Sequence, residues 1–443
     1  MKNVRQCWTA ALFILIFSWL MMDTAFADGG SEKLKKRIDQ AAPGETVLLP
    51  PGEYEGPLRL VKPVILKAEH PGTAVLTRKT DEPALRIEAD GVTVSGLQIA
   101  DDQVWKSPAV WVEGDRVKLD GLTVRAGSTG IALREANDGE ISNSLVEWNG
   151  ELSIPLFDRG NGIDLYKSPR GRVIGNTVRN VYDAIYIESS DETSVIENRV
   201  EHSRYGVHFM YSNQAVIRGN TGEMNITGAM IMTVRGAVLS DNAFAKQSEN
   251  VHSQGILLYD AHESAVLRNA VEGNRVGLYI EESNGNRIED NLVDSNFIGI
   301  QLLSSKQNAI HGNTFIRNVV DAQAQSSEQN AIEGNYWDAF RGIDTDGDGR
   351  SNIRYAINPF FQELASKRPA FQLFFQSPGI LFLENLYQSE QKGWAQDVSP
   401  LMKPPDPAAA RNTRSGGIGS GLAGLFLLGA ACVVIIFGRR KRS

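Results

Sequence analysis

Two adjacent copies of one repeat stand at residues 198–241: NRVEHSRYGVHFMYSNQAVIRG (198–219) and NTGEMNITGAMIMTVRGAVLSD (220–241). Each copy begins with asparagine and has a glycine eight residues later. The asparagine recurs every 22 residues, apart from one interval of 27, at Asn176, Asn198, Asn220, Asn242, Asn269, Asn291, Asn313 and Asn335. A fixed interval of this length indicates a solenoid of stacked repeats and argues against a globular domain.

The segment after each glycine alternates apolar and other side chains, as a strand with one buried face does. Val207 and Phe209 therefore share one side, and we expect their counterparts in the other repeats to form the core. Parallel coils stack at about 4.8 Å and place equivalent residues directly above one another. The asparagines are then expected to form an internal amide ladder. The sequence predicts an all-β, right-handed parallel β-helix of about a dozen coils.

Both ends of the chain have the sequence patterns expected of targeting signals. Residues 1–27 combine basic residues, an apolar run and a small-residue cleavage site, which predicts a signal peptide. Residues 416–438 form an uncharged apolar stretch long enough for one transmembrane helix, and residues 439–443 form a basic cytoplasmic tail. A cleavable sorting signal is the alternative for this C-terminus. We expect an extracytoplasmic domain, in the periplasm or on the outer face of the cell membrane, with a single-pass C-terminal anchor.

The exported part divides into four further segments. Residues 28–95 are assigned to an N-terminal cap with a short helix and the first coils, and residues 96–340 to the repeats. Residues 341–403 contain an acidic loop and a capping segment, and residues 404–415 read as a linker. The aromatic residues expected to cap the last coil, or alternatively to contact a membrane or a permease, are Phe360, Phe361, Phe371, Phe374, Phe375 and Phe382.

The composition excludes several classes of protein. Cys7 and Cys432 both fall in the apolar ends, so the exported domain is expected to have no disulfides and no thiolate metal sites. The net charge of -8 makes nucleic acid an improbable partner. Because the chain contains no Gly-Lys pair, it has no Walker-type phosphate loop. Any coupling to ATP must come from another protein.

One group of outward side chains is chemically distinctive. His208 and Met210 lie ten and twelve residues past Asn198, and Met230 and Met232 occupy the same positions in the next repeat. Stacking predicts a two-by-two patch of these four side chains, facing solvent. Two insertions, around residues 147–160 and 245–253, are expected to frame this patch, and the second contains His252.

Methionine is concentrated at this patch. Five methionines follow residue 27, and four of them lie between residues 210 and 232. His202 and Met224 also occupy equivalent repeat positions, at a turn beside the strand. Thioether and imidazole without thiolate favour Cu(I). We therefore identify His208, Met210, Met230, Met232 and His252 as candidate copper ligands. The alternative is an apolar docking patch, and the two interpretations can coexist because a docked metallochaperone could share ligands with it.

A second candidate metal site is the acidic loop. Asp344, Asp346 and Asp348 stand at positions 1, 3 and 5 of an EF-hand-like calcium loop, with glycine at position 6. Asn352 fills position 9, but Tyr355 occupies position 12, where such loops have a bidentate glutamate. Both a calcium site and an acidic surface turn are consistent with this pattern.

Three segments stand out in the sequence: RYGVHFMYSN (204–213), GNYWD (334–338) and PFF (359–361). Together they resemble the NosD family, which takes part in maturation of the copper centres of nitrous oxide reductase. The resemblance implies a β-helix that works outside the cytoplasm with an ABC-type ATPase and permease (NosF and NosY). It also implies copper delivery from the chaperone NosL and contact with the reductase NosZ. The C-terminal apolar segment departs from the soluble form associated with this family.

The rival class is a surface protein that binds or cleaves polysaccharide, because many β-helices do so along an outer sheet. Acids for such chemistry are available at Asp164, Asp183, Glu188 and Glu281, and stacking rings at Tyr166, Tyr186, Tyr259 and Tyr279. Hydrolysis needs two carboxylates about 5 to 9 Å apart. However, Met230 and Met232 are expected in the middle of the groove that a polysaccharide would occupy along this sheet. We therefore predict a docking platform for copper delivery that is not an enzyme.

Overall fold

The chain divides into two compact units, Met1–Pro404 and Pro405–Ser443. The computed structural model describes residues 28–150, 153–247, 252–358, 360, 364, 367–374, 377–386 and 394–405.

Several predicted segments fall outside the described residues. They are the signal peptide (1–27), the transmembrane segment (416–438), the basic tail (439–443) and most of the linker (404–415). Among the residues that are described, no helix has both the length and the apolar character needed to cross a membrane.

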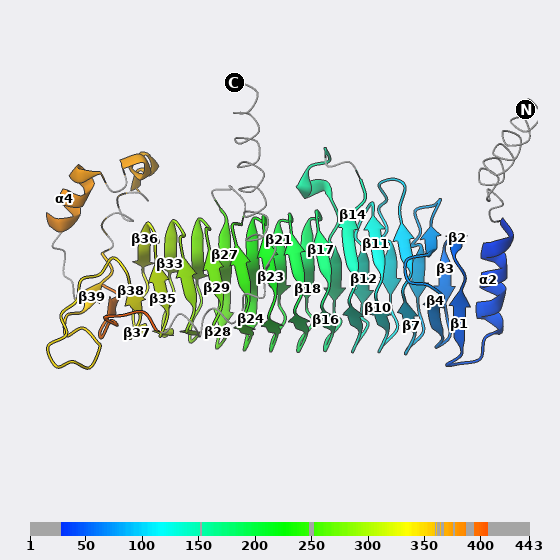
Figure 1. The fold of residues 1–443 in the computed structure, drawn as a ribbon, viewed down its shortest axis with the longest axis horizontal. Coiled ribbons are helices and arrows are strands. Elements are labelled where there is room, and N and C mark those ends of the chain that lie inside the picture. Colours follow the sequence, from blue (N-terminus) through cyan, green and yellow to red (C-terminus); the bar gives the residue numbers. More distant parts are fainter. Residues whose placement is uncertain are drawn as a thin grey trace, which may run out of the picture. The chain divides into compact units, whose positions relative to one another are not determined.

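The first unit winds through three parallel sheets, as Figure 1 shows. The first sheet has 15 strands, in the order β1 (Thr46–Leu49), β4 (Ile65–Ala68), β7 (Thr93–Ser95), β10 (Lys118–Asp120), β13 (Glu140–Ser142), β16 (Arg172–Ile174), β19 (Ser194–Ile196), β22 (Val216–Arg218), β25 (Val238–Ser240), β28 (Ala265–Leu267), β31 (Arg287–Glu289), β34 (Ala309–His311), β37 (Ala331–Glu333), β40 (Gln396–Asp397) and β39 (Tyr355–Ala356).

The second sheet has 13 strands, namely β2 (Gly52–Glu55), β5 (Ala74–Thr77), β8 (Gln98–Ala100), β11 (Thr123–Ala126), β14 (Leu145–Trp148), β17 (Thr177–Arg179), β20 (Arg199–Glu201), β23 (Thr221–Glu223), β26 (Ala243–Ala245), β29 (Ala270–Glu272), β32 (Leu292–Asp294), β35 (Thr314–Ile316) and β38 (Tyr336–Trp337). The third sheet has 12 strands, namely β3 (Leu58–Leu60), β6 (Leu85–Ile87), β9 (Val110–Val112), β12 (Ile131–Arg134), β15 (Ile163–Tyr166), β18 (Asp183–Glu188), β21 (Tyr205–Met210), β24 (Thr227–Arg235), β27 (Gln254–His262), β30 (Val276–Glu281), β33 (Ile298–Leu303) and β36 (Val320–Gln325).

The strand register follows the repeat. Val207 of β21 pairs with Ala229 of β24, 22 residues later, and Ala229 pairs with Ile256 of β27 across the 27-residue interval. Val207 and Phe209 are completely buried, as are most of their counterparts, because alternate side chains of each strand point into the coil. The predicted all-β, right-handed parallel β-helix is confirmed, with about 13 turns.

The predicted asparagine ladder is present at the turn between the first and second sheets. The backbone N–H of Asn198 donates to Oδ1 of Asn220 at 2.9 Å, and its Nδ2 donates to the same oxygen at 3.0 Å. This pattern runs from Asn176 to Asn335, whose backbone N–H and Nδ2 donate to Oδ2 of Asp397. Each buried amide thus satisfies the backbone of its neighbour.

A second amide ladder was not predicted. It lies at the turn between the second and third sheets and runs through Asn225, Gln247, Asn274, Asn296 and Asn318. In the longer coil, Gln247 takes the place of asparagine. The series is therefore not visible in the sequence as a regular repeat of asparagine.

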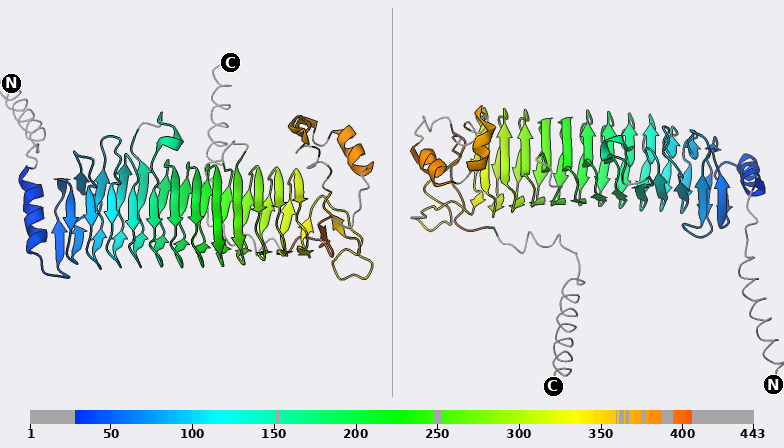
Figure 2. Two further views of the ribbon diagram at one scale, coloured as in Figure 1. Left: turned by 180° about the vertical axis from the view of Figure 1, so that it is seen from behind. Right: turned by 90° about the horizontal axis from the view of Figure 1, so that it is seen from above.

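Both ends of the solenoid are covered. At the N-terminus α2 (Asp28–Gln40) lies against the first coil and buries Leu34 and Ile38, as the views in Figure 2 show for the helix. With 13 residues, α2 is longer than the short helix expected in this cap. At the other end the ring of Trp337 stacks on Phe315 with a centroid distance of 4.2 Å, and the ring of Tyr355 lies 4.8 Å from that of Trp337.

The cap at the C-terminal end differs from the phenylalanine cap that we expected. Phe374 and Phe382 are exposed, and Phe361 and Phe375 lie outside the described residues. Phe371 packs with Ile380 between η2 (Pro369–Phe374) and α4 (Pro378–Leu386). The last coil is covered instead by Tyr355 and by the antiparallel pair β39–β40, because these strands continue the first sheet.

Candidate functional site

The four candidate ligands on the third sheet are adjacent, as predicted. His208 pairs with Met230, and Met210 pairs with Met232, between the neighbouring strands β21 and β24. The expectation that all four face solvent is wrong for two of them, because His208 is only 4% exposed and Met230 only 9%. Aromatic rings cover the imidazole, since the centroids of Tyr186 and Tyr205 lie 5.0 and 4.8 Å from it.

The four side chains form part of the lining of a hollow of about 490 Å³ on the outer face of the third sheet. The lining residues are Asn161, Tyr182, Asp183, Tyr186, Arg204, Tyr205, His208, Met210, Met230 and Met232. Three thioethers and one imidazole therefore share one partly enclosed space with aromatic walls.

A buried carboxylate holds the imidazole in place. Oδ2 of Asp183 lies 2.9 Å from Nδ1 of His208, and the Asp183 side chain is 1% exposed. Arg204 donates from Nε and Nη2 to the two carboxylate oxygens of Asp183, at 2.7 and 2.6 Å. The guanidinium of Arg204 also lies over the rings of Tyr182 and Tyr205, at 3.8 and 4.3 Å from their centroids.

The protonation of this group follows from its hydrogen bonds. Burial alone would raise the pKa of Asp183, but the hydrogen bonds from Arg204 and His208 outweigh it and hold the pKa below its ordinary value. An ionised carboxylate only accepts hydrogen bonds, so Nδ1 of His208 carries a proton. Nε2 of His208 is buried and has no hydrogen-bond partner. In the neutral imidazole this nitrogen has a free lone pair, as a metal ligand requires.

A tyrosine at the edge of the hollow contacts one of the thioethers. The hydroxyl of Tyr186 donates to Oε2 of Glu188 at 2.7 Å and lies 3.5 Å from Sδ of Met210. Burial and then the neighbouring Glu188 carboxylate raise the pKa of Tyr186 above its ordinary value. The phenol therefore stays neutral near pH 7 and keeps its proton as a hydrogen-bond donor.

Sequence reasoning did not assign Asp183, Arg204 or Tyr205 to this site. Asp183 precedes His208 by 25 residues, one repeat plus three positions, so the interval of 22 does not reveal the contact. Arg204 and Tyr205 belong to segment 204–213, which resembles the NosD family. That resemblance was the signal that could have pointed to these two residues.

The two insertions differ in their relation to the hollow. In the first, η1 (Leu156–Asp158) places Phe157 edge-on to Tyr182, with a centroid distance of 6.0 Å, and Asn161, directly after the insertion, lines the hollow itself. In the second, residues 248–251 lie outside the described part of the chain, and His252 is exposed and does not line the hollow. The structure therefore brings four of the five candidate copper ligands together.

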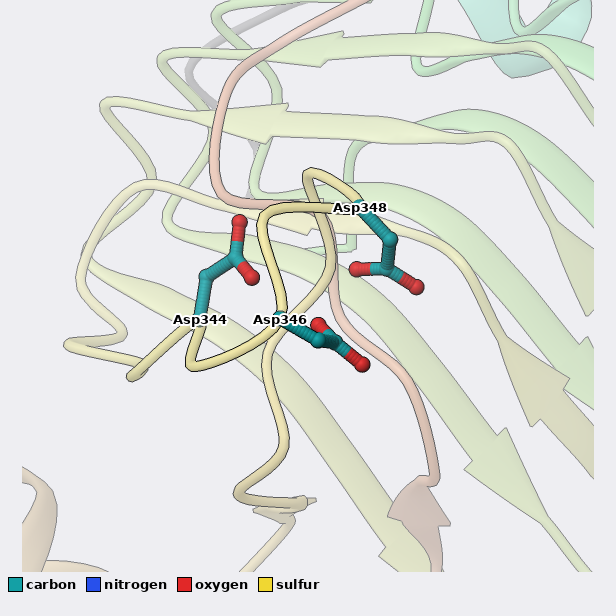
Figure 3. Close-up of side chains that lie close together, drawn as sticks. All are labelled: Asp344, Asp346 and Asp348. Carbon is teal, nitrogen blue, oxygen red and sulfur yellow. The ribbon is translucent and has the colours of Figure 1, made fainter.

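The acidic loop gathers its three carboxylates on one turn, as Figure 3 shows. One carboxylate oxygen from each of Asp344, Asp346 and Asp348 lies within 4.8 Å of the others. Hydrogen bonds from the backbone N–H groups of Gly347 and Gly349 lower the pKa of Asp344. Oδ1 of Asn352 accepts from the backbone and hydroxyl of Thr345, both at 2.7 Å, so it does not face the three carboxylates as a free ligand.

The acids considered for polysaccharide chemistry are engaged in hydrogen bonds or ion pairs. Oδ1 of Asp164 lies 2.7 Å from Nη1 of Arg134, and its Oδ2 accepts from Asn161. Glu281 accepts from the hydroxyl of Tyr279 at 3.0 Å, which repeats the Tyr186–Glu188 pair. These contacts fix the carboxylates in place along the sheet.

Comparison with known proteins relates this chain to one family. Residues 148–342 match the family model described as "Periplasmic copper-binding protein (NosD)". The chain is 29% identical over 140 residues to the "Probable ABC transporter binding protein NosD" of Stutzerimonas stutzeri. This match covers 30% of the chain and 31% of that protein, so it spans less than a third of either. The resemblance to NosD is confirmed.

Solved structures with the same fold are more distant in sequence. The A-module of the mannuronan C-5 epimerase AlgE6 of Azotobacter vinelandii has a TM-score of 0.56 at 16% identity, covering 69% of this chain and 94% of that one. A family 28 exopolygalacturonase of Yersinia enterocolitica has a TM-score of 0.55 at 11% identity, covering 70% and 77%. At such low identity the likeness supports the β-helix fold alone.

Proposed function

We propose that this chain, whose residues 148–342 match the NosD family, handles copper outside the cytoplasm for the maturation of a copper enzyme. The hollow on the third sheet receives Cu(I), with His208, Met210, Met230 and Met232 as ligands. His252 is not needed for this ligand set. The ion is cargo that the protein binds and releases, and no covalent chemistry of its own is required.

The observation that carries this proposal is the environment of His208. Its Nδ1 is held by Asp183, and its Nε2 is buried without a partner. The imidazole lines the hollow together with three methionines. Leaving a buried nitrogen unpaired costs roughly 1–3 kcal/mol, and binding a soft cation removes that cost. Histidine ligands of metals commonly donate the N–H of their other ring nitrogen to a carboxylate, which fixes the tautomer and the orientation of the ring.

The relatives suggest the partners. The Stutzerimonas stutzeri protein is named as an ABC transporter binding protein, so we propose docking to an ABC ATPase and permease of the NosF and NosY type. Copper would come from a chaperone such as NosL and pass to a reductase such as NosZ. Export by residues 1–27 and membrane attachment by residues 416–438 complete this proposal, since both would place the hollow outside the cytoplasm.

Anaerobic titration of the full chain with Cu(I) against a chromophoric chelator tests metal binding. Replacing Met210, Met230 and Met232 with leucine removes the sulfur ligands at nearly constant volume and is expected to abolish tight binding. Asp183→Asn should weaken binding about 10- to 100-fold, as for other residues that orient a ligand. Met402→Leu is the matched control.

Unchanged Cu(I) affinity in the triple leucine variant would leave a docking surface that does not ligate copper. The rival function, binding or cleavage of polysaccharide, is tested separately by titration with acidic oligosaccharides. Binding that depends on Asp164 or Glu188 would favour the rival.

A further inference from the structure

A second imidazole–thioether pair lies on the same two coils as the hollow. His202 and Met224 occupy equivalent positions at the turn between the second and third sheets, after β20 and β23. The backbone N–H of His202 donates to the carbonyl of Glu223, the residue before Met224, so the two residues stand on adjacent coils. Neighbouring coils are about 4.8 Å apart, which lets one nitrogen and one sulfur bind the same ion.

This pair differs from the hollow in its exposure. Met224 is 46% exposed, and His202 is also exposed, whereas His208 is 4% exposed. Within the described part of the chain, neither the imidazole of His202 nor the thioether of Met224 makes a hydrogen bond or an ion pair. Both donor atoms are therefore available to an ion that arrives from solvent or on a carrier.

The pair lies beside the hollow. His202 is two residues before Arg204, whose side chain lines the hollow, so the turn is about 7 Å of chain from that edge. Four of the five methionines after residue 27 fall on these two coils, together with two of the six histidines of the chain. This concentration of soft donors covers both the exposed turn and the buried hollow.

We propose that His202 and Met224 form an exposed acceptor site for Cu(I), from which the ion passes to the hollow. The transfer part rests on the proposed function of the hollow. Two ligands from one exposed turn leave coordination positions open to a ligand of the donor, so a mixed complex can form. Each step replaces one metal–ligand bond with another, and copper stays in the +1 state throughout.

The test counts Cu(I) equivalents on the full chain, titrated anaerobically against chelators of different strength. Wild type is expected to bind one tight and one weaker equivalent. Met224→Leu and His202→Gln should each lose the weaker equivalent and keep the tight one. His70→Gln and Met402→Leu are matched controls that should keep both, because His70 is exposed on a distant coil.

The triple leucine variant at Met210, Met230 and Met232 separates the two proposals. It should lose the tight equivalent and keep the weaker one, and X-ray absorption of the remaining copper should show nitrogen and sulfur ligands. If the triple leucine variant lost the tight equivalent while both turn variants, Met224→Leu and His202→Gln, still bound copper like wild type, the acceptor site would be overturned. The hollow would then stand as a copper site. A weaker equivalent that depends on Met224, with no tight equivalent in wild type, would support the acceptor site and refute the hollow as a copper site.

Loading kinetics supply a second readout. Copper presented as its glutathione complex should fill the hollow of Met224→Leu several-fold more slowly than in wild type, while the final affinity of the tight site stays unchanged. Equal loading rates in Met224→Leu and wild type would contradict passage of the ion through the turn.

Discussion

Asp321→Asn is expected to stabilise the protein at neutral and alkaline pH. Asp321 lies in β36 opposite Gly299 of β33, in a column that carries small residues in earlier coils. It is 5% exposed, and neither carboxylate oxygen has a hydrogen bond of good geometry. Burial and then the charge of Asp338 raise the pKa of Asp321 from 3.8 to about 7, although the Ala339 backbone and Asn318 partly oppose this.

The sign follows from the direction of this shift. Because the pKa is higher in the folded state, the folded protein holds the proton more tightly, and its contribution to stability is complete below about pH 4. That contribution is lost as the pH rises through about 7. A difference of about three pKa units corresponds to about 4 kcal/mol, which is the upper limit of the penalty at pH 8. Asparagine has nearly the same shape and is neutral at every pH.

Urea unfolding from pH 4 to pH 8, followed by a probe in the last coils, measures the effect. The gap in unfolding free energy between Asp321→Asn and wild type should widen as the pH rises and level off above pH 7. Asp338→Asn should shrink the gap by removing the charge that helps raise the pKa of Asp321. Glu328→Gln, an exposed change in the same region, is the control. A gap of constant size across this range would refute the reasoning.

Two further changes test the ladder and the acidic loop. Asn220→Ala removes the acceptor of the backbone N–H and Nδ2 of Asn198. It should lower the free energy of unfolding in urea by roughly 3–6 kcal/mol. The exposed change Asn213→Ala is the comparison, and a loss under about 1 kcal/mol in Asn220→Ala would show that water replaces the ladder. Calcium should raise the melting temperature of the full chain, and chelator should reverse this, if Asp344, Asp346 and Asp348 bind it; an identical rise in Asp346→Asn would show that calcium acts elsewhere.

The repeat interval predicted the fold and the columns because parallel coils force residues one repeat apart into contact. His208, Met210, Met230 and Met232 could therefore be placed side by side from sequence. Their depth could not, because it depends on how the rings of Tyr186 and Tyr205 pack over the imidazole.

Contacts that fall outside the repeat interval were also beyond sequence reasoning. The residue paired with His208 on the preceding coil is Tyr186, but the carboxylate that contacts His208 belongs to Asp183, three residues before Tyr186. In the C-terminal cap, Tyr355 and Asp397 belong to no repeated position. They meet Trp337, which does continue the repeat, only because β39 and β40 extend the first sheet.

The ladder of amides has a direction, since every asparagine donates toward the C-terminus and the final carboxylate of Asp397 only accepts. A copy of residues 291–312, which has Gln301 and Leu303 at the ligand positions, would preserve this chain of donors as well as the core if it were spliced in after residue 219. It would nevertheless add one coil, about 4.8 Å, between the imidazole of His208 and the sulfur of Met230. The number of turns therefore sets the spacing of the ligands. Coils added away from the hollow would leave the four side chains adjacent, whereas a coil without histidine or methionine at the ligand positions, inserted at this junction, would take them out of reach of a shared ion.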